Sequence, residues 1–484
     1  MKRTAVLNVV GLTRGLVGEH TPRLRAFLER STVAHIDPAF PAVTCTAQSN
    51  YLTGKVPSQH GIVGNGWYDW GLSEVHFWKQ SNRLVEAPKL FEELKALKPE
   101  FTCAKLFWWY NMYSGADWSI TPRPMYPADG RKFFDIYTWP LNLRTEIKRE
   151  IGEFPFATFW GPAAGRSSPQ GPPDGASRWI AASARWVEER HSPTLSLVYL
   201  PHLDYNLQRF GTVDPSKPGR PPISEILPDL TAIDTVVGDL IDFYSNRGVQ
   251  VVVLSEYGIT PVSTPIHINR ELRRRGWITV RDELGLELLD TGNSLAFSVA
   301  DHQVAHVHVK DPTLRNTVRE MLMGLDGIAE VLDGAGKQVR GIDHRRAGDL
   351  IAIARENAWF TYYYWMDDDR APDFARTVDI HRKPGYDPVE LFTDPALSPM
   401  ALKARIAWRL IQKKLGFRML MNVIPLDATL VKGSHGVRPS NRDDWPLLLT
   451  PSPEGAGKKE ETSAAPHVVA STEVYSIIKT LVLS

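Results

Sequence analysis

The sequence predicts an α/β fold in which a mostly parallel central sheet carries helices on both faces. Short β-branched runs of nearly continuous apolar residues recur along the chain, and stretches with helical spacing separate them. A strand covered on both faces is apolar throughout, because neither side of its sheet meets water. The composition, with 43% hydrophobic and 23% charged residues, is that of a globular chain able to bury a sizeable core.

The first expected strand is formed by residues 5–10, and the apolar residues of 22–30 then follow helical spacing. Residues 223–244 have apolar positions three and four apart, so we expect a second, longer helix there. Three more runs have the character of the first strand: residues 102–106, 195–200 and 250–254. Strands that alternate with helices in this way are typical of parallel sheets.

Two regions depart from this alternation. Residues 107–175 are rich in Trp, Tyr, Pro and Gly, and we expect an irregular insertion there. Residues 295–365 contain several short strand candidates around one helix, which predicts a smaller α+β unit. The expected core, in which the sheet lies between two layers of helices, therefore comprises residues 1–294 and 366–450.

The C-terminal part of the chain changes character. Residues 451–468 are polar and small, which predicts a flexible linker. Residues 469–484 include an apolar stretch that we expect to dock on the core as a helix.

Charge and cysteine content exclude several classes of function. The chain has 56 basic and 55 acidic residues, so no global field attracts nucleic acid or an anionic membrane, although a local basic patch remains compatible with this balance. Its two cysteines cannot form a disulfide framework. No run is long enough for a membrane span, and the N-terminus lacks the cleavage site of a signal peptide. We expect a cytoplasmic protein.

The segment 40–65 carries the strongest chemical signal. An extended piece leads to Thr44, a helix of about two turns follows, and Gly54 provides its stop signal. A hydroxyl at the start of a helix lies where free backbone N–H groups and the helix dipole favour an anion such as phosphate. The alternative is that Thr44 or Thr46 only caps the helix.

The same segment resembles the type I phosphodiesterase/nucleotide pyrophosphatase family of the alkaline phosphatase superfamily. The resemblance lies in Thr53-Gly54 and in the run PSQHGIVGN that ends at Asn65. It implies that Thr44 is a nucleophile and that Asn65 binds a phosphoryl oxygen. Where the family has Phe-Pro-Asn after the nucleophile, this chain has Cys-Thr-Ala, so Thr46 is a reserve nucleophile.

The resemblance also implies two zinc ions held at the C-terminal ends of strands. The family has an Asp-Gly pair after its first strand, but this chain has Val10-Gly11, so one metal carboxylate is missing. At the remaining metal positions Asp204 and His435 keep the family's residue type, whereas Gln208, Glu256 and Tyr257 replace it. This oxygen-rich set suits Mg, Mn or Ca better than two zinc ions, or else a single zinc ion.

These residues lead to a functional hypothesis with alternatives. We expect a metal-dependent hydrolase of phosphodiesters, pyrophosphates or phosphate monoesters that forms a phospho-enzyme intermediate on Thr44. Its partner would be a small phosphate ester or a nucleotide-like molecule. The alternatives are a non-catalytic phosphate- or ligand-binding protein of the same fold, and related chemistry such as phosphonate cleavage or phosphoryl transfer.

Other polar clusters are weaker candidates for metal binding. His302, His306 and His308 fall on one face of an expected strand, where we interpret them as the polar outer face of a half-buried strand. The run Asp367–Asp369 follows an aromatic stretch and is expected to start a loop.

Three further features stay open or weak. Residues 379–387 combine carboxylates, an imidazole and cations, which fits either a phosphate clamp or a surface turn. The aromatic cluster 107–113 fits either a pocket wall or the core of the insertion. Cys45 adjoins Thr44, but a thiolate role has no counterpart in the family that we can map.

Overall fold

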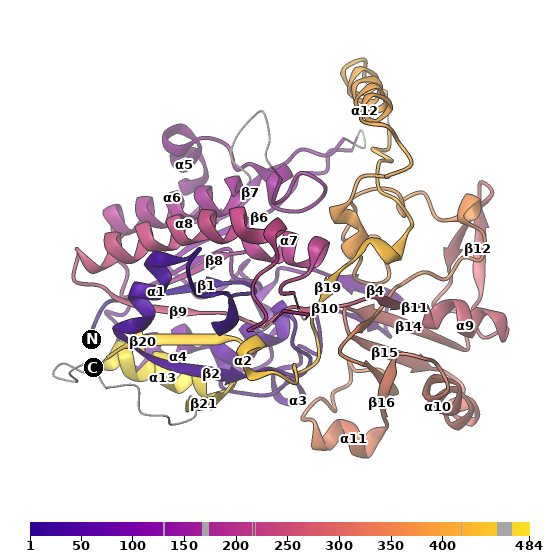
Figure 1. Ribbon diagram of the computed structural model, residues 1–484, viewed down its shortest axis with the longest axis horizontal. Helices are drawn as coiled ribbons and strands as arrows, with labels where there is room; N and C mark the ends of the chain where they lie inside the picture. Colours follow the sequence, from indigo (N-terminus) through magenta and orange to yellow (C-terminus); the bar gives the residue numbers. More distant parts are fainter. Residues whose placement is uncertain (129–130, 167–173, 215, 218, 418, 453–466) are drawn as a thin grey trace.

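The centre of the protein is a nine-stranded sheet in the order β21-β2-β20-β9-β1-β8-β5-β6-β7 (Figure 1). The computed structural model describes residues 1–128, 131–166, 174–214, 216–217, 219–417, 419–452 and 467–484. The nine strands are β1 (Thr4–Val9), β2 (Ser31–Asp37), β5 (Cys103–Leu106), β6 (Trp118–Pro122), β7 (Ile136–Trp139), β8 (Leu195–Leu200), β9 (Gln250–Leu254), β20 (Leu447–Pro451) and β21 (His467–Ala470).

Most neighbours in this sheet are parallel. Strand β1 lies between β8 and β9 and is parallel to both, with Thr4 opposite Leu195 on one side and Gln250 on the other. Only β20 and β7 run against their neighbours. All six residues of β1 are buried, as a strand covered on both faces requires. The predicted mostly parallel sheet is confirmed.

Helices cover both faces of the sheet (Figure 1). On one face lie α1 (Pro22–Glu29), α6 (Gly175–His191) and α8 (Leu227–Ser245), which contact one another. On the other face lie α2 (Thr44–Thr53), α4 (Leu90–Leu97) and α13 (Glu473–Leu483), also in mutual contact. The three-layer α/β architecture expected from the sequence is therefore confirmed.

The region 107–175 is more regular than we expected. Strands β6 and β7 continue the central sheet beyond β5, and α5 (Leu143–Ile151) follows them. The backbone of residues 118–122 can extend the sheet although the neighbouring loops are rich in aromatic residues and proline. Residues 107–175 are thus in part an edge of the core sheet.

The C-terminal segment also differs in detail from the expectation. Strand β21 pairs in parallel with β2, with Ile36 opposite Val469, and α13 follows it against α2. The polar stretch expected to be a linker begins at Pro451, the last residue of β20, and its residues 453–466 lie outside the described residues. The sheet therefore gains a strand directly before the expected docking helix.

Residues 295–365 contain a second, antiparallel sheet in the order β14-β15-β17-β16. Its strands are β14 (Ala296–Asp301), β15 (Val304–Val309), β16 (Ile328–Leu332) and β17 (Leu350–Ala354), and α10 (Arg315–Met323) and α11 (Gly334–Val339) accompany them. Both faces of β15 are buried, so His306 and His308 are not on a polar outer face, and that interpretation is wrong.

Smaller elements join these two sheets. They are α3 (Pro57–His60), β3 (Gly66–Asp69), β4 (Glu74–Phe77), α7 (His202–Phe210), β10 (Thr260–Pro261), β11 (Thr264–Ile266), α9 (Ile268–Arg274), β12 (Val280–Glu283), β13 (Leu286–Leu289), β18 (Ala358–Phe360), α12 (Pro399–Lys414) and β19 (Gly433–Ser434). Among the helices of the described residues, we find none with the length and apolar character needed to span a bilayer.

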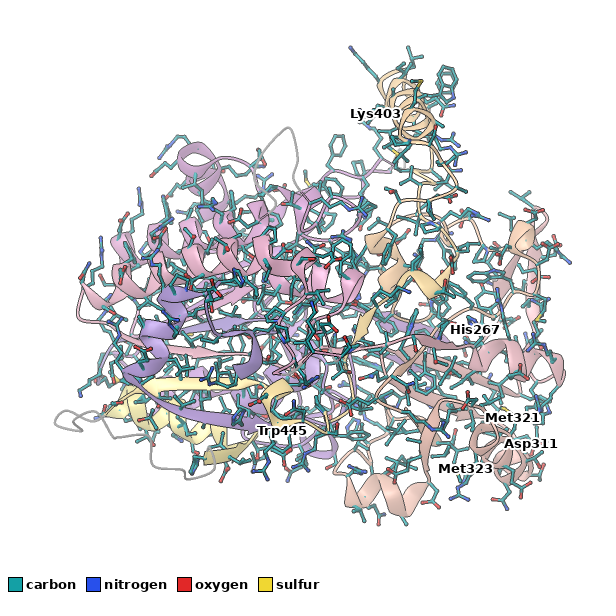
Figure 2. All side chains as sticks on the ribbon, in the orientation of Figure 1. His267, Asp311, Met321, Met323, Lys403 and Trp445 are labelled. Atoms are coloured by element: carbon teal, nitrogen blue, oxygen red, sulfur yellow. The ribbon has the colours of Figure 1, made fainter. Side chains whose placement is uncertain are left out.

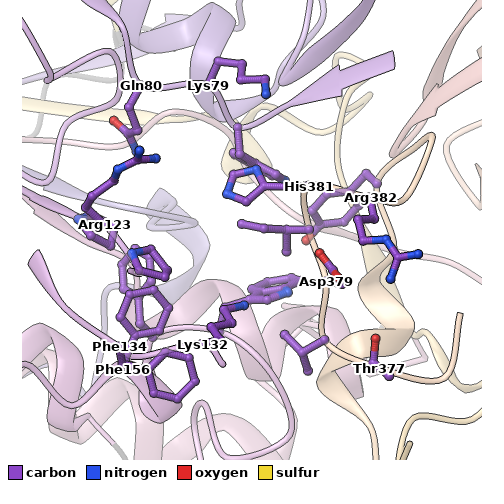
Figure 3. A pocket seen from close by; sticks show the side chains of 18 of the residues that line it. Lys79, Gln80, Arg123, Lys132, Phe134, Phe156, Thr377, Asp379, His381 and Arg382 are labelled. Carbon is purple, nitrogen blue, oxygen red and sulfur yellow. The ribbon is translucent and has the colours of Figure 1, made fainter. Parts of the chain in front are cut away.

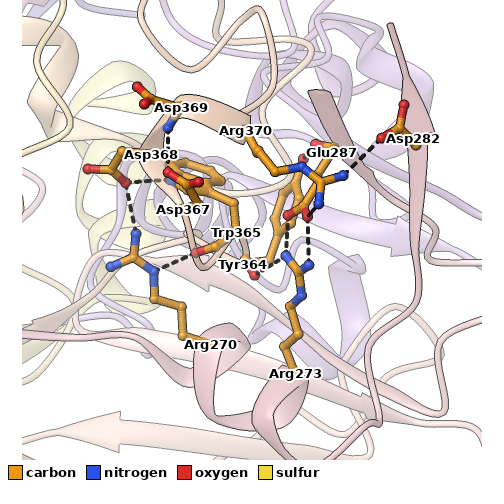
Figure 4. Close-up of polar contacts among 10 residues, drawn as sticks. All are labelled: Arg270, Arg273, Asp282, Glu287, Tyr364, Trp365, Asp367, Asp368, Asp369 and Arg370. Atoms are coloured by element: carbon orange, nitrogen blue, oxygen red, sulfur yellow. Dashed lines mark hydrogen bonds and ion pairs between the residues drawn. The ribbon is translucent and has the colours of Figure 1, made fainter. Parts of the chain in front are cut away.

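The acidic run Asp367–Asp369 lies at a turn and is used in ion pairs and hydrogen bonds (Figure 4). Asp368 accepts a hydrogen bond from the indole N–H of Trp365 at 2.8 Å and pairs with Arg270 on α9. Arg370 pairs with Asp282 and Glu287. These contacts agree with the expectation that the run starts a loop.

Candidate active site

Thr44 is the first residue of α2 and lines a cavity of about 1850 Å³. Val43 before it is extended, so the chain turns into the helix at the threonine. The ten-residue helix ends at Gly54, whose positive φ of 65° is the left-handed conformation that suits glycine. The Thr44 side chain therefore reaches the cavity from the N-terminal end of α2, where the helix dipole favours negative charge.

Three predicted site residues meet Thr44 in a chain of hydrogen bonds. The hydroxyls of Thr44 and Tyr257 are 3.2 Å apart, and the phenol of Tyr257 donates to Oδ1 of Asp204 at 3.1 Å. Nε2 of Gln208 donates to the other carboxylate oxygen of Asp204 at 2.8 Å. Asp204 and Gln208 lie on α7 after β8, and Tyr257 follows β9, so parallel strands deliver them to one edge of the sheet.

Burial changes the protonation of this chain. It raises the pKa of Asp204 to about 7, although hydrogen bonds from Tyr257 and Gln208 act in the opposite direction. It also raises the pKa of Tyr257 well above that of a free phenol. Near neutral pH the carboxyl of Asp204 can thus take up a proton, while Tyr257 stays a neutral phenol that can pass one on.

Glu256 is placed beside this chain but behind the cavity wall. One of its oxygens accepts from the amides of Asn8 at 2.6 Å and Gln48 at 2.5 Å, and the side chain is fully buried. Burial raises its pKa to about 8, against hydrogen bonds from Gln48, Asn8 and Thr44. Asn8 on β1 points to Glu256, whereas the expected carboxylate position, Val10, is apolar and buried.

His435 follows β19 and packs against Tyr257 without lining the cavity itself. Its Nδ1 donates to the carbonyl of Ala42 at 2.8 Å, and its buried Nε2 has no hydrogen-bond partner. The ring stacks on Tyr257 with centroids 3.5 Å apart and an angle of 7°. Burial lowers the pKa of His435 to about 3, so the imidazole is neutral. It holds the phenol of Tyr257 in position.

The side chains that the resemblance assigns to metal do not fit a two-metal centre in this arrangement. Across the part of the chain that the structure describes, no group of three or more His, Cys, Asp or Glu side chains could hold an ion. Both oxygens of Asp204 are engaged by Tyr257 and Gln208, and Tyr386 donates to Oε1 of Gln208 at 3.1 Å. Asp204, Gln208 and Tyr257 thus satisfy one another, whereas Oε2 of Glu256 and Nε2 of His435 are buried without a hydrogen-bond partner among the described residues.

Asn65 is brought near Thr44, but it does not line the cavity and its amide group is engaged by other partners. Its Oδ1 accepts from the backbone N–H of Cys45 at 3.0 Å, and its Nδ2 donates to Asp301 at 3.0 Å. Its backbone N–H donates to the second oxygen of Asp301 at 2.7 Å. Asn65 therefore fixes the start of α2 to Asp301 at the end of β14, a contact that the sequence did not reveal.

The structure separates Thr44 from the two neighbouring candidates. The hydroxyl of Thr46 donates to the carbonyl of Ile62 at 3.2 Å, and this side chain is fully buried. Burial raises the pKa of Cys45 well above its usual value, which leaves an inert thiol. Of these three residues, Thr44 alone lines the cavity.

The cavity has aromatic walls and cations at its outer part. Trp109 and Tyr113 of the aromatic cluster 107–113 line it, while Trp108 belongs to the core, so both readings of that cluster hold in part. Figure 3 shows Lys79, Arg123 and Lys132 around the hollow, together with His381. Such a lining suits a ligand that combines negative charge with an apolar or ring-shaped part.

The segment 379–387 is divided between the cavity and the core. His381 and Arg382 line the cavity (Figure 3), whereas Lys383 is buried and pairs with Asp387 at 2.7 Å and Glu390 at 2.8 Å. His381 and Arg382 are exposed at a turn, whereas residues 383–387 are buried, so the surface-turn interpretation holds only for the first part of the segment. Its buried ion pairs hold the backbone that presents the imidazole.

Sequence reasoning placed His302 on a strand face and did not single out Tyr386 within the stretch 379–387. His302 is not on a strand but in the turn between β14 and β15, with a φ of 60°. Its ring lies 3.6 Å from that of His435 and 3.7 Å from that of Tyr386, and it lines the cavity. The sequence signal that could have revealed this position is a histidine in a two-residue connection between two expected strands.

The fold and this strand-edge site define a protein of the alkaline phosphatase-like class, in which a hydroxyl begins a helix at the C-terminal ends of parallel strands. The model of the type I phosphodiesterase/nucleotide pyrophosphatase family matches residues 4–387. The chain belongs to this family, and the resemblance found in its sequence is confirmed.

Solved structures share the fold. Murine ectonucleotide pyrophosphatase/phosphodiesterase 5, seen as an inactive variant with AMP, has a TM-score of 0.56 and 13% identity, covering 100% of this chain and 95% of its own. The human protein has a TM-score of 0.57 at the same identity and coverage. Phosphonoacetate hydrolase from Sinorhizobium meliloti 1021, with phosphonoformate, has a TM-score of 0.55 and 13% identity, covering 99% and 96%.

One curated relative matches in sequence. It is an uncharacterized pyrophosphatase/phosphodiesterase of Schizosaccharomyces pombe, 22% identical over 251 residues. The match covers 50% of this chain and 41% of the relative, so less than half of that protein's length is represented.

Proposed function

We propose that this protein hydrolyses phosphate esters of the phosphodiester or pyrophosphate type and that Thr44 is its nucleophile. The observation that carries the proposal is the hydrogen-bonded chain from Thr44 through Tyr257 to Asp204, at the wall of the large cavity. A weakly acidic hydroxyl needs a base to become a nucleophile, and this chain ends in a carboxylate.

The first chemical step follows from these contacts. Oγ1 of Thr44 attacks phosphorus, and its proton passes to the phenol oxygen of Tyr257 while the phenol proton moves to Asp204. The bond between phosphorus and the leaving oxygen breaks, and its electron pair leaves with that oxygen. Leaving groups that are stable as anions, such as a second phosphate, fit best because this step gives them no proton.

The second step regenerates the threonine. Water attacks the phosphothreonine, its hydroxide stays on phosphorus, and its remaining proton is taken by the released leaving group. The proton on Asp204 returns through Tyr257 to Oγ1 of Thr44. The N-terminal end of α2 favours the negative charge carried by the phosphoryl group in both steps.

Whether the hydrolysis requires a divalent metal is tested separately from the role of Thr44. The family resemblance implies Zn, whereas the oxygen donors of Asp204, Gln208, Glu256 and Tyr257, with the imidazole nitrogen of His435, suit Mg, Mn or Ca. The mutual hydrogen bonds of Asp204, Gln208 and Tyr257 do not fit a two-metal centre, although Oε2 of Glu256 and Nε2 of His435 are buried without a partner among the described residues. The proton transfers proposed for Thr44 therefore use only the protein's own groups.

The test is a panel of p-nitrophenyl phosphate mono- and diesters, a dinucleotide pyrophosphate and phosphonoacetate. Each is assayed with chelator and with added Zn, Mg, Mn or Ca, and bound metal is measured by elemental analysis. We expect turnover that Thr44→Ala abolishes, with a phosphothreonine trapped at low pH in the wild type. Equal rates for wild type and Thr44→Ala on every substrate would rule out the proposal.

A second candidate function is ligand binding without turnover. The observation that favours it is the closed set of hydrogen bonds, in which Asn65 is held by Asp301 and Asp204 by two donors. Calorimetry with AMP and inorganic phosphate on wild type and Thr44→Ala distinguishes the two. Binding by both variants, with no turnover by either, would establish the non-catalytic function.

A further inference from the structure

Helix α12 (Pro399–Lys414) stands away from the rest of the protein (Figure 1). Leu402 and Ile406 pack against the hydrophobic core around the antiparallel sheet and anchor one side of the helix. The other side consists of large apolar residues that are exposed by 49–81% of their surfaces: Met400, Trp408, Ile411 and Leu415. A soluble protein rarely leaves so many large apolar side chains together in water without a function for them.

These exposed residues form one face of the helix. Met400, Trp408, Ile411 and Leu415 are separated by eight, three and four positions, so at 3.6 residues per turn they fall within about a quarter of its circumference. Ala404 and Ala407 occupy the positions between them. The result is a narrow apolar stripe that nothing in the described structure covers.

Positive charge surrounds this stripe. Residues 399–426 contain no aspartate or glutamate, although the chain as a whole is nearly neutral. Lys403 extends into solvent from α12 (Figure 2). The described cations of this stretch are Lys403, Arg405, Arg409 and Lys414. An apolar stripe flanked by lysine and arginine matches a bilayer surface that carries anionic lipid headgroups.

The third side of α12 faces the cavity that contains Thr44. Ile406, Leu410 and Lys414, four residues apart, line this cavity. Phe417 and Leu420, beyond the end of the helix, line it too and are also largely exposed. Helix α12 therefore has one exposed apolar face and another face that forms part of the apolar wall of the cavity that contains Thr44.

We propose that α12 docks on an anionic lipid surface and that the adjoining cavity takes a phosphoester with an apolar tail from it. The stripe would lie among the headgroups and upper acyl chains, with Trp408 at the interface, and the cations would contact lipid phosphates. The apolar mouth at Leu410 and Phe417 would accept the tail, while the headgroup moves toward Thr44. The substrate part rests on the proposed hydrolase function, whereas the docking part does not.

Charge argues against the other occupants of this stripe. In a symmetric dimer α12 would meet its own copy, and cations without any acidic partner would face one another. An acidic protein would match the charge, but the stripe is continuous with the apolar cavity mouth, which a lipid tail fits. The experiment below includes both alternatives as outcomes.

The test uses the full chain and sedimentation with vesicles of phosphatidylcholine, with or without phosphatidylglycerol. We expect binding to the anionic vesicles that weakens with salt. Lys403→Gln with Arg405→Gln should weaken it roughly fivefold for each cation, and Trp408→Ser with Ile411→Ser roughly tenfold for each side chain. The control is Leu284→Ser, which removes a fully exposed leucine at the β12–β13 turn and should change nothing.

Three results would overturn the docking proposal. One is failure of the wild type to bind anionic vesicles at low salt. Another is equal loss of binding in Leu284→Ser and in the α12 variants. The third is a dimer in sedimentation velocity that Trp408→Ser with Ile411→Ser dissociates, because the stripe would then be covered by a second copy.

Comparing the hydrolysis of two substrates separates the proposed lipid substrate from the proposed hydrolase function. Hydrolysis of a soluble p-nitrophenyl ester should be unchanged in Trp408→Ser with Ile411→Ser, while hydrolysis of a long-chain alkyl phosphoester in vesicles should fall at least tenfold. Activity on the soluble ester with none on the lipid ester would overturn the lipid substrate alone. No activity on either ester would overturn the hydrolase function and leave docking to the vesicle experiment.

Discussion

At the scale of single residues, Tyr257 connects the proposed nucleophile, Thr44, to the proposed base, Asp204. Its phenol contacts the hydroxyl of Thr44 and the carboxylate of Asp204, and His435 stacked on its ring holds it there. We expect Tyr257→Phe to lower kcat by about 10²–10⁴-fold, the usual contribution of positioned proton transfer. KM should change little, because the phenylalanine ring keeps the stacking. Steady-state kinetics on a p-nitrophenyl diester measures both values.

The base is expected to show itself in the pH dependence of the same reaction. Asp204 has to be ionised to accept a proton, and burial raises its pKa to about 7. The rate should therefore rise as pH increases through about 7, and Asp204→Asn should remove both this step and most of the activity. A wild-type rate that is flat between pH 6 and 8 (roughly one unit either side of that pKa) would contradict Asp204 as the base.

Asp301 is a third residue with a testable role, and this role is structural. It accepts from the backbone and side-chain nitrogens of Asn65, and Asn65 in turn accepts from Cys45 at the start of α2. Asp301→Ala leaves two buried donors without a partner, at a cost of about 1–3 kcal/mol each. Denaturant unfolding of this variant should show that loss. Asp301→Asn, which retains an acceptor, should lose less, and equal losses would contradict the assignment.

At the scale of elements, the short strand β19 decides where His435 lies. The backbone of β19 passes α7 so closely that a Cβ on Gly433 would lie 2.1 Å from the carbonyl oxygen of Leu207. The neighbouring Lys432 N–H donates to the carbonyl of Gln208 at 2.9 Å. This approach joins the element that carries His435 to the helix that carries Asp204.

We therefore expect Gly433→Ala to push β19 away from α7. The variant should lose about 1–3 kcal/mol of stability through overpacking, and its activity should fall because His435 no longer supports Tyr257. Gly334→Ala on α11 is the matched control, since a Cβ there meets nothing within 4 Å. Thermal unfolding and the ester assay measure both effects, and normal activity in Gly433→Ala would separate β19 from the site.

The elements differ in how well the sequence predicts them. Residues 195–200 and 250–254 form β8 and β9 with the predicted limits, because a buried parallel strand has to be continuously apolar. Strand β21, with the sequence HVVA, lies at the edge of the sheet and has two of its four residues valine, so nothing in its pattern separates it from a linker. Edge strands carry weaker signals because only part of their surface is buried.

At the scale of the whole molecule, the site depends on contacts that cross the chain. Thr44, Asp204 and Tyr257 come from the central sheet, whereas His302 and Asp301 come from the antiparallel unit. Family motifs predict the first group, because each motif is local and follows its own strand. The second group could not be predicted, because its approach depends on how two sheets pack together.

The same packing buries many ionisable groups, which sets the acid stability of the molecule. Burial lowers the pKa of His435 to about 3 and that of His306 to about 4. Four more buried histidines have lowered pKa values for the same reason: His60, His267, His302 and His308. In the unfolded chain a histidine takes up a proton near pH 6.5, so its contribution to stability is complete above that pH and is lost as the pH falls toward the folded value.

Buried carboxyls act in the opposite direction. The raised pKa values of Asp204, Glu256 and Asp301, at about 7 to 8, make their contribution largest at low pH and remove it as the pH rises through that range. Among the described residues, eleven histidines with lowered pKa values outnumber six carboxyls with raised ones. Between about pH 4 and 6.5 each net proton changes the unfolding free energy by about 1.4 kcal/mol per pH unit.

We therefore expect the free energy of unfolding to decrease as the pH is lowered from about 6.5 to 4. Urea midpoints measured at several pH values in this window test the direction. His306→Gln should flatten the slope by about one proton, since glutamine does not titrate and its amide can still donate to the carbonyl of Val63 that His306 contacts at 3.0 Å. A midpoint that rises as the pH falls through this window would mean that the carboxyls dominate and that the histidines are hydrated in the folded protein.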